Sequence, residues 1–258
     1  MSVLVLMYHG VEDTDGPLFV PPSLFTAQMD AIAAARIPVL TMSAVADGLL
    51  RRTLPDRAVA LTFDDAFLSV VENAASILAR RGLCATVFAV AGRLGGTNQW
   101  PSGRPGAPIV ALAKAADLSR LAAAGFEIGA HGMDHEPFDT DDPRVIRREV
   151  SEARTLLERA VGGHIRSVAY PYGAMPTATA KQAVCETYAV ACTTRIGRVH
   201  HGADPHALPR VDVHYLRSLR VFEAVLDGRA NAYLALRRAA ANARRRVRRD
   251  YVRPAGVQ

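Results

Sequence analysis

The hydrophobic positions of this chain fall into short apolar runs separated by longer amphipathic stretches. Runs rich in Val, Ile, Leu and Ala with little polar alternation predict strands that are buried on both faces, as in a parallel sheet. The segments with this pattern are 3–8, 58–63, 84–90, 126–130, 165–170, 188–193 and 208–214. Most stretches between them are long enough for the crossover that joins two parallel strands. The pattern therefore predicts one barrel-like α/β domain.

The connecting stretches show helical spacing and typical helix ends. The predicted helices are 23–36, 44–51, 69–81, 116–124, 142–161 and 177–186. Ser23 is the expected N-cap of the first helix, because its hydroxyl can accept a backbone N–H. Residues 91–110 differ from the other connections, since they are rich in Gly and Pro and contain Trp100. Long irregular loops in compact domains often border functional sites, and we expect the same of this loop.

The net charge of +6 is concentrated at the C-terminal end. Residues 237–258 contain eight Arg and one Asp, a net +7, which leaves about −1 for residues 1–236. We predict a barrel domain over residues 1–220 and a basic helical extension over residues 221–258. The default interpretation of this tail is a solvated or partly disordered extension. The more specific hypothesis is a membrane-surface contact, because a basic tail can contact anionic lipid. No specific nucleic acid is expected, because Tyr251 is the only aromatic residue within the Arg run.

The cellular compartment is predicted from the absence of targeting and membrane-spanning patterns in the sequence. No apolar run approaches the roughly 20 residues that span a bilayer, and the first residues show no basic leader or cleavage site. The three cysteines form no Cys-x-x-Cys pair, which favours buried reduced thiols. We expect a cytoplasmic protein, with the tail at the inner face of the membrane.

The first candidate for chemistry is the pair Asp64-Asp65, which directly follows the apolar run 58–63. Two adjacent carboxylates at a strand end repel each other, so they need a cation, a shared proton or strong donors nearby. An alternative is that they cap the helix predicted from Ser69.

His131 and His135 supply a candidate cation site, and His131 also follows a predicted strand. Two His at i and i+4 share a face if the segment is helical, and both imidazoles then reach one metal. Two His and one carboxylate form a three-ligand set that leaves positions open on a divalent metal. We expect zinc, with cobalt and nickel as alternatives, because imidazole and carboxylate ligands suit several metals.

Three motifs in this order resemble those of the NodB-like polysaccharide deacetylases, carbohydrate esterase family four. They are Thr62-Phe63-Asp64-Asp65, His131-x-x-x-His135 and Ala169-Tyr170-Pro171-Tyr172-Gly173. The resemblance covers most of residues 3–215. It implies a distorted (β/α)7-type barrel of mostly parallel strands, and metal-dependent hydrolysis of an N- or O-acyl group on a sugar.

The resemblance also implies roles for single residues. Asp65, His131 and His135 would bind the metal, and Asp64 would be the general base. The backbone N–H of Tyr172 would stabilise the tetrahedral oxyanion. Pro171 and the Tyr172 ring would then lie against the substrate.

The general acid departs from the common family pattern, because the late segment 208–214 lacks the usual Leu-x-His triplet. Leu6-Met7-Tyr8-His9 instead resembles the exopolysaccharide poly-N-acetylglucosamine deacetylase branch, in which the acid His comes from the N-terminal part. We favour His9 as the acid and keep His214 as the alternative and as a substrate contact. Arg210 resembles the Arg that pairs with the base in that branch, and the alternative is a surface ion pair.

Two further positions depart from the family, with Ala66 in place of the usual Gly and Gly132 in place of the usual Ser or Thr. Trp100 could form a sugar-stacking rim or pack inside the protein. We predict an enzyme that removes an N-acetyl or other N-acyl group from an amino sugar. The alternatives are a deformylase or deacetylase of a lipid-linked or small-molecule amino sugar, and a non-catalytic sugar-binding barrel.

Overall fold

The computed structural model of the chain describes residues 2–100 and 108–248, with side chains of the last helix described as far as Ala243. The strands of the main sheet are β1 (Ser2–Tyr8), β4 (Val39–Leu40), β5 (Arg57–Phe63), β6 (Thr86–Ala89), β7 (Glu127–Ala130), β8 (Ser167–Ala169), β9 (Val190–Cys192) and β10 (Val211–Asp212). Their order is β10-β1-β5-β6-β7-β8-β9, β4 pairs with β5, and every pair is parallel. The predicted α/β class is confirmed.

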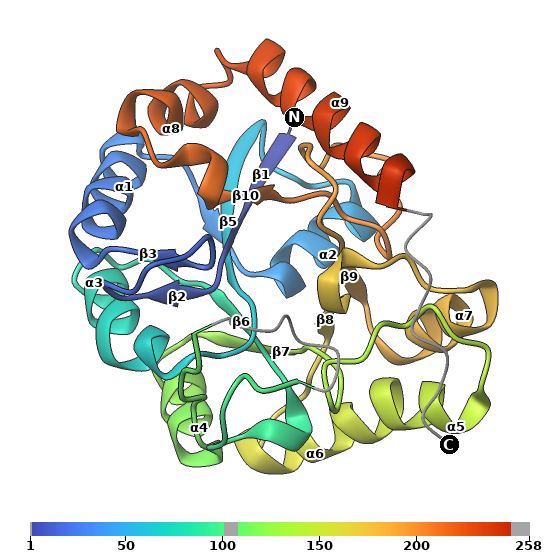
Figure 1. Cartoon of the computed structure of the whole chain (residues 1–258). Helices are drawn as coiled ribbons and strands as arrows, with labels where there is room; N and C mark the ends of the chain where they lie inside the picture. The colour runs from blue at the N-terminus through green and yellow to red at the C-terminus, as the bar shows by residue number, and fades with distance from the viewer. Residues whose placement is uncertain (1, 101–107, 249–258) are drawn as a thin grey trace.

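The segment before β10 joins the two ends of this sheet. Leu208 forms a parallel bridge with Cys192 at the end of β9, and three residues later Val211 pairs with Leu6 of β1. The Leu208 carbonyl also accepts the N–H of Thr193 at 2.8 Å. Residues 208–212 therefore link β9 to β1, and the strands curl into the predicted distorted barrel (Figure 1).

Helices surround this sheet on its outer side (Figure 1). The α-helices are α1 (Pro22–Ala35), α2 (Met42–Arg51), α3 (Ala75–Ala79), α4 (Ala115–Ala123), α5 (Pro143–Ile146), α6 (Ala153–Val161), α7 (Ala178–Thr187), α8 (Leu219–Leu226) and α9 (Asn231–Arg248). Two π-helical segments, η1 (Val70–Ala74) and η3 (Arg147–Glu152), and three 3₁₀ segments, η2 (Ala91–Arg93), η4 (Pro171–Gly173) and η5 (Val213–Leu216), complete the set. A small separate ladder joins β2 (Gly10–Val11) to β3 (Phe19–Val20).

Burial on both faces explains why the strands are continuous apolar runs. In β1, Leu4 and Leu6 belong to the large core cluster that also contains buried residues of α1 and α8. Val3 and Val5 point to the opposite face and belong to a second cluster, which includes Phe88. Alternate strand residues face opposite sides, so a strand inside a covered barrel needs apolar residues at both.

Element ends differ from the predictions in ways that have local causes. The first helix begins at Pro22 after Pro21, so Ser23 is not its N-cap; proline already has the backbone angle that the first helical turn requires. The predicted helix 142–161 contains the π-helical segment η3 between α5 and α6. Several strands are also shorter than their apolar runs, such as β6 within 84–90.

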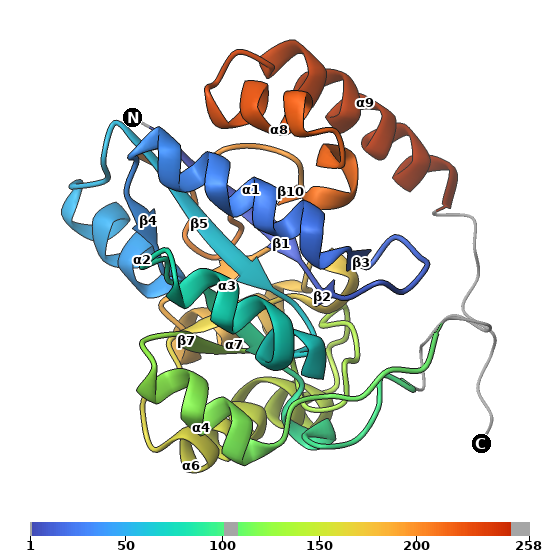
Figure 2. The same cartoon turned by 90° about the vertical axis from the view of Figure 1, so that its left-hand side faces the viewer.

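The C-terminal part packs on the barrel before it continues as α9. Helix α8 contacts α1 (Figure 2). Its residues Phe222 and Val225 are buried in the large core. Arg237 of α9 stacks over the rings of Tyr215 and Tyr233.

The domain division at residue 220 stays a prediction. The arginine side chains from position 244 onward lie outside the described residues, so the membrane-surface contact also stays a prediction. No helix within the described ranges is long and apolar enough to cross a membrane.

Candidate active site

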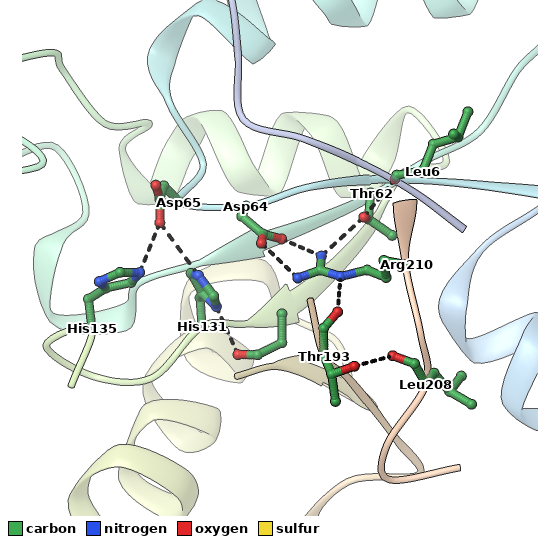
Figure 3. A network of polar contacts seen from close by, with 10 residues as sticks. Leu6, Thr62, Asp64, Asp65, His131, His135, Thr193, Leu208 and Arg210 are labelled. Atoms are coloured by element: carbon green, nitrogen blue, oxygen red, sulfur yellow. Dashed lines mark hydrogen bonds and ion pairs between the residues drawn. The ribbon is translucent and has the colours of Figure 1, made fainter. Parts of the chain in front are cut away.

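The candidate residues gather at one edge of the barrel because its strands run parallel. His9 follows β1, Asp64 and Asp65 follow β5, and His131 follows β7. The carboxyl ends of parallel strands meet at the same edge, where α/β barrels place their active sites. Arg210 reaches this edge from the segment that closes the barrel, just before β10. Figure 3 shows the part of this group formed by Asp64, Asp65, His131, His135 and Arg210.

Arg210 and Asp64 form a buried pair with two-point contact. The guanidinium donates to Asp64 Oδ1 at 2.6 Å and to Oδ2 at 2.8 Å, and the two residues are 1% and 3% exposed. Its Nε donates to the Thr193 carbonyl at 3.0 Å, and Nη1 also donates to Thr62 Oγ1 at 3.2 Å. Burial alone would raise the pKa of Asp64, but the guanidinium of Arg210 outweighs it and holds the pKa well below its usual value. Asp64 is therefore ionised and fixed, and Arg210 forms no surface ion pair.

Asp65 turns toward the two histidines instead. Its Oδ1 lies 3.5 Å from His131 Nε2 and 3.3 Å from His135 Nε2, and all three residues are buried. His131 Nδ1 donates to the Ala169 carbonyl at 2.8 Å, which leaves the Nε2 lone pair facing Asp65. Burial raises the pKa of Asp65 and lowers the pKa of His135, so this imidazole is held neutral.

This cluster fits a divalent metal ion. The three ligand atoms lie within 4.8 Å of one another, and Asp65 Oδ1 is buried with no hydrogen-bond partner among the described residues. An unpartnered carboxylate oxygen facing two imidazole nitrogens is costly unless a cation lies between them. Asp65, His131 and His135 could therefore hold the predicted metal. The alternative that Asp64 and Asp65 cap a helix is wrong for Asp64, whose carboxylate is bound to Arg210.

The segment that joins the two histidines is not helical, so their rings do not meet on the shared helix face that the i, i+4 spacing allows. Residues 131–135 form a loop in which Gly132 has φ +80° and His135 has φ +63°. The left-handed residues reverse the chain and bring both rings to Asp65. Non-glycine residues rarely adopt such angles, yet Asp65, Ala66 and Tyr172 adopt them at this edge as well. Backbone strain is thus concentrated where these side chains converge.

The two candidate acids occupy different positions. His9 is half-buried and lies close enough to the carboxylates for its charge to oppose the effect of burial on the pKa of Asp65. The exposed His214 lies in η5, where its backbone N–H donates to the carboxylate of the N-cap residue Asp212 and its ring contacts Tyr215. Of the two candidate acids, His9 is therefore the one whose charge acts on the Asp64-Asp65 pair.

Aromatic side chains border His135. The Trp100 ring stacks on the His135 ring at 4.6 Å, and the Tyr172 ring meets it edge-on at 4.5 Å. Tyr172 is 47% exposed, whereas Pro171 beside it is buried. Trp100 thus lies beside the candidate metal ligands, as expected if loop 91–110 borders the site.

Sequence reasoning missed the residues that orient this group. The Thr62 hydroxyl bridges Arg210 and the Leu6 carbonyl, and the Ala169 carbonyl fixes the ring of His131. Both residues lie inside the quoted motifs, but a hydrogen bond between strands distant in sequence leaves no pattern of spacing.

Comparison with known proteins gives the same fold. YxkH of Bacillus subtilis (strain 168), a proposed polysaccharide deacetylase, is 24% identical over 224 residues, which cover 86% of this chain and 75% of that protein. The deacetylase PplD of Streptococcus pyogenes, solved in complex with acetate, superposes with a TM-score of 0.72 at 22% identity and covers 82% of this chain and 92% of its own. IcaB from Ammonifex degensii has a TM-score of 0.72 at 23% identity, over 88% of this chain and 96% of its own. A family model described as polysaccharide deacetylase matches residues 51–190, more than half of the sequence, and the chain therefore belongs to the polysaccharide deacetylase family.

Proposed function

We propose that this protein is a metal-dependent hydrolase that removes an N-acetyl or other N-acyl group from an amino sugar in a glycan or glycan precursor. The observation that carries the proposal is the pairing of two buried groups at one barrel edge. One is an ionised carboxylate held by Arg210, and the other is the Asp65, His131 and His135 cluster. Sugar binding alone requires no ionised carboxylate beside a metal site.

Asp65, His131 and His135 would hold the metal, which we expect to be zinc, with cobalt or nickel as alternatives. When bound, such a metal polarises the acyl carbonyl and lowers the pKa of a nearby water. The protein's own contribution is to keep both imidazole Nε2 atoms and one carboxylate oxygen directed at the same point. The hydrogen bond from His131 to the Ala169 carbonyl supports this orientation.

Asp64 is the proposed general base. It accepts a proton from the water that attacks the acyl carbon, and the contact with Arg210 keeps it ionised and correctly oriented. The backbone N–H of Tyr172 is the proposed donor to the oxyanion. His9 then protonates the leaving amine, so the C–N bond breaks into a carboxylic acid and a free amino sugar. The proposed contacts of the sugar rings are Trp100, Tyr172, Pro171 and His214.

The test combines metal analysis with measurement of released acid. Purified full-length protein is reconstituted with zinc, cobalt or nickel and incubated with N-acetylated and N-formylated amino sugars, both oligomeric and monomeric. Release of acetate, abolished by a chelator and restored by metal, is the expected result. Formate release would favour the deformylase alternative. Bound metal without any acid release across the panel would contradict the proposed activity.

The choice of acid is tested by His9→Ala and His214→Ala. A general acid contributes roughly 10²- to 10⁴-fold in rate. We expect His9→Ala to lose kcat by this order with bound metal unchanged, and His214→Ala to change mainly KM. The reverse result would assign the acid to His214.

A further inference from the structure

The loop between His131 and His135 has no regular structure of its own and is held by hydrogen bonds from both sides. On one side, the N–H groups of Ala91 and Gly92 in η2 donate to the carbonyls of Gly132 and Met133 at 3.0 and 2.8 Å. These bonds satisfy the loop's acceptors. Its donors need a partner on the opposite side, because buried backbone N–H groups are rarely left unpaired.

Glu149 is that partner. Its Oε2 accepts the N–H of Met133 at 2.8 Å, and both of its oxygens lie 3.2 Å from the N–H of Asp134. The residue is 2% exposed, and no ion pair to it is found among the described side chains. A carboxylate buried without a cation is costly, and bonds to two successive N–H groups offset that cost.

The glycine at position 132 fits this carboxylate. A Cβ placed on Gly132 would lie 2.5 Å from Glu149 Oε2, and the φ of +80° is unfavourable for any other residue. Glycine at this position therefore leaves the space that the Glu149 carboxylate occupies against the loop. The two positions are coupled although they lie 17 residues apart in the sequence.

Glu149 reaches the loop from a π-helical turn, η3, that interrupts an otherwise α-helical segment. Such turns are uncommon and often occur beside functional sites, because the extra residue redirects side chains. Arg148 on the same turn donates to the Asp134 carboxylate at 2.9 Å. Two adjacent side chains of η3 thus hold the same loop.

We infer that Glu149 is a positioning residue that sets the separation of the His131 and His135 rings and thereby the metal affinity. The inference rests on the proposed function, because it assumes that these rings bind the metal. Glu149 contacts neither ring. It fixes the backbone between them, and Gly132 provides the space for its carboxylate.

The test compares Glu149→Gln with Glu152→Gln, an exposed residue of the same π-helical turn that pairs with Arg147 and does not contact the loop. In Glu149→Gln the amide has one acceptor oxygen, and its NH₂ opposes a backbone N–H. Zinc affinity is measured on metal-free protein by competition with a chelator, and cobalt absorption reports the ligand geometry. Hydrogen exchange measures the amides of Met133 and Asp134 without metal.

We expect Glu149→Gln to weaken zinc binding about 10- to 100-fold, the usual effect of changing a residue that supports a ligand. Hydrogen exchange at Met133 and Asp134 should become faster. Glu152→Gln should match the wild type in zinc affinity and in exchange. Wild-type zinc affinity in a folded Glu149→Gln protein would overturn the inference. If the wild type binds none of zinc, cobalt and nickel, the proposed function fails. Unchanged exchange at Met133 and Asp134 in Glu149→Gln would then separately overturn the support of the loop by Glu149.

A second pair of variants tests the coupling to Gly132. Gly132→Ala should displace the Glu149 carboxylate, and far-UV circular dichroism checks that the protein still folds. In a Glu149→Ala background the same change should weaken zinc binding several-fold less, because the carboxylate is already absent. Equal losses in the two backgrounds would contradict the coupling.

Discussion

Asp64 and Asp65 are adjacent in sequence and almost equally buried, yet their carboxylates have opposite surroundings. Both oxygens of Asp64 accept hydrogen bonds from Arg210, so the protein itself neutralises this charge. Asp65 Oδ1 faces two imidazole nitrogens and has no hydrogen-bond partner among the described residues. This difference supports the two different roles proposed for the carboxylates of one motif. A carboxylate that a guanidinium keeps ionised and oriented is the candidate base, and one that lacks a partner is the candidate metal ligand.

The largest expected effect comes from changing each carboxylate to its amide. Asp65→Asn should lose most of the metal together with activity, because it removes a charged ligand. Asp64→Asn should keep the metal and lower kcat roughly 10²- to 10⁴-fold, as expected for loss of a general base. Metal content and acid release are measured on both variants below their melting temperatures. Equal metal loss in the two variants would remove the distinction between the carboxylates.

The next effect concerns the Arg210 side of the site. Arg210→Met leaves the buried carboxylate of Asp64 without its partner, which should lower the free energy of unfolding by about 3–5 kcal/mol. Denaturant unfolding measures this loss. The double variant Arg210→Met, Asp64→Asn should recover part of the free energy of unfolding, because the unpaired buried charge is then removed. If the double variant loses as much free energy of unfolding as the two single variants together, the unpaired charge of Asp64 is not the cause of the instability.

The chemistry at the strand ends could be predicted from the sequence, whereas the way the side chains meet could not. The apolar runs before Asp64 and before His131 indicate parallel strands, and parallel strands place their ends at one edge. The i, i+4 spacing would bring the two histidines to one face only if the segment were helical. The structure has a loop instead, because Gly132 and the carboxylate of Glu149 stabilise a left-handed turn. No local pattern connects position 132 with position 149.

A smaller effect on substrate binding is expected at Trp100, which lies beside His135. Trp100→Ala should raise KM for an amino-sugar oligomer about 2- to 10-fold, which corresponds to about 0.5–1.5 kcal/mol of aromatic contact. Zinc affinity should change little, because the Trp100 ring stacks on His135 without supplying a ligand atom. Steady-state kinetics separates the two parameters, and Trp100→Phe serves as the conservative control. A fall in kcat at unchanged KM would argue that Trp100 supports the ring of His135 instead of the substrate.

The smallest effect tests the turn that separates the two carboxylates. Asp65 and Ala66 have φ values of +69° and +54°, and this left-handed turn directs Asp65 away from the Asp64 side. Ala66→Gly should relieve about 1–2 kcal/mol of strain at Ala66. It also loses about 0.8 kcal/mol from one buried methyl group and about 0.5–1 kcal/mol through greater freedom of the unfolded chain. These contributions nearly cancel, so the free energy of unfolding should stay close to that of the wild type.

Ala74→Gly is the matched control, because Ala74 is as buried as Ala66 but has an ordinary helical φ of −66°. This substitution relieves no strain and should therefore lower the free energy of unfolding by about 1–2 kcal/mol. Denaturant unfolding of both variants gives the difference, which measures the strain stored in the turn. Equal costs would show that the left-handed turn stores none. The separation of Asp64 from Asp65 would then be stabilised by Arg210 and the histidines alone, without a contribution from the backbone.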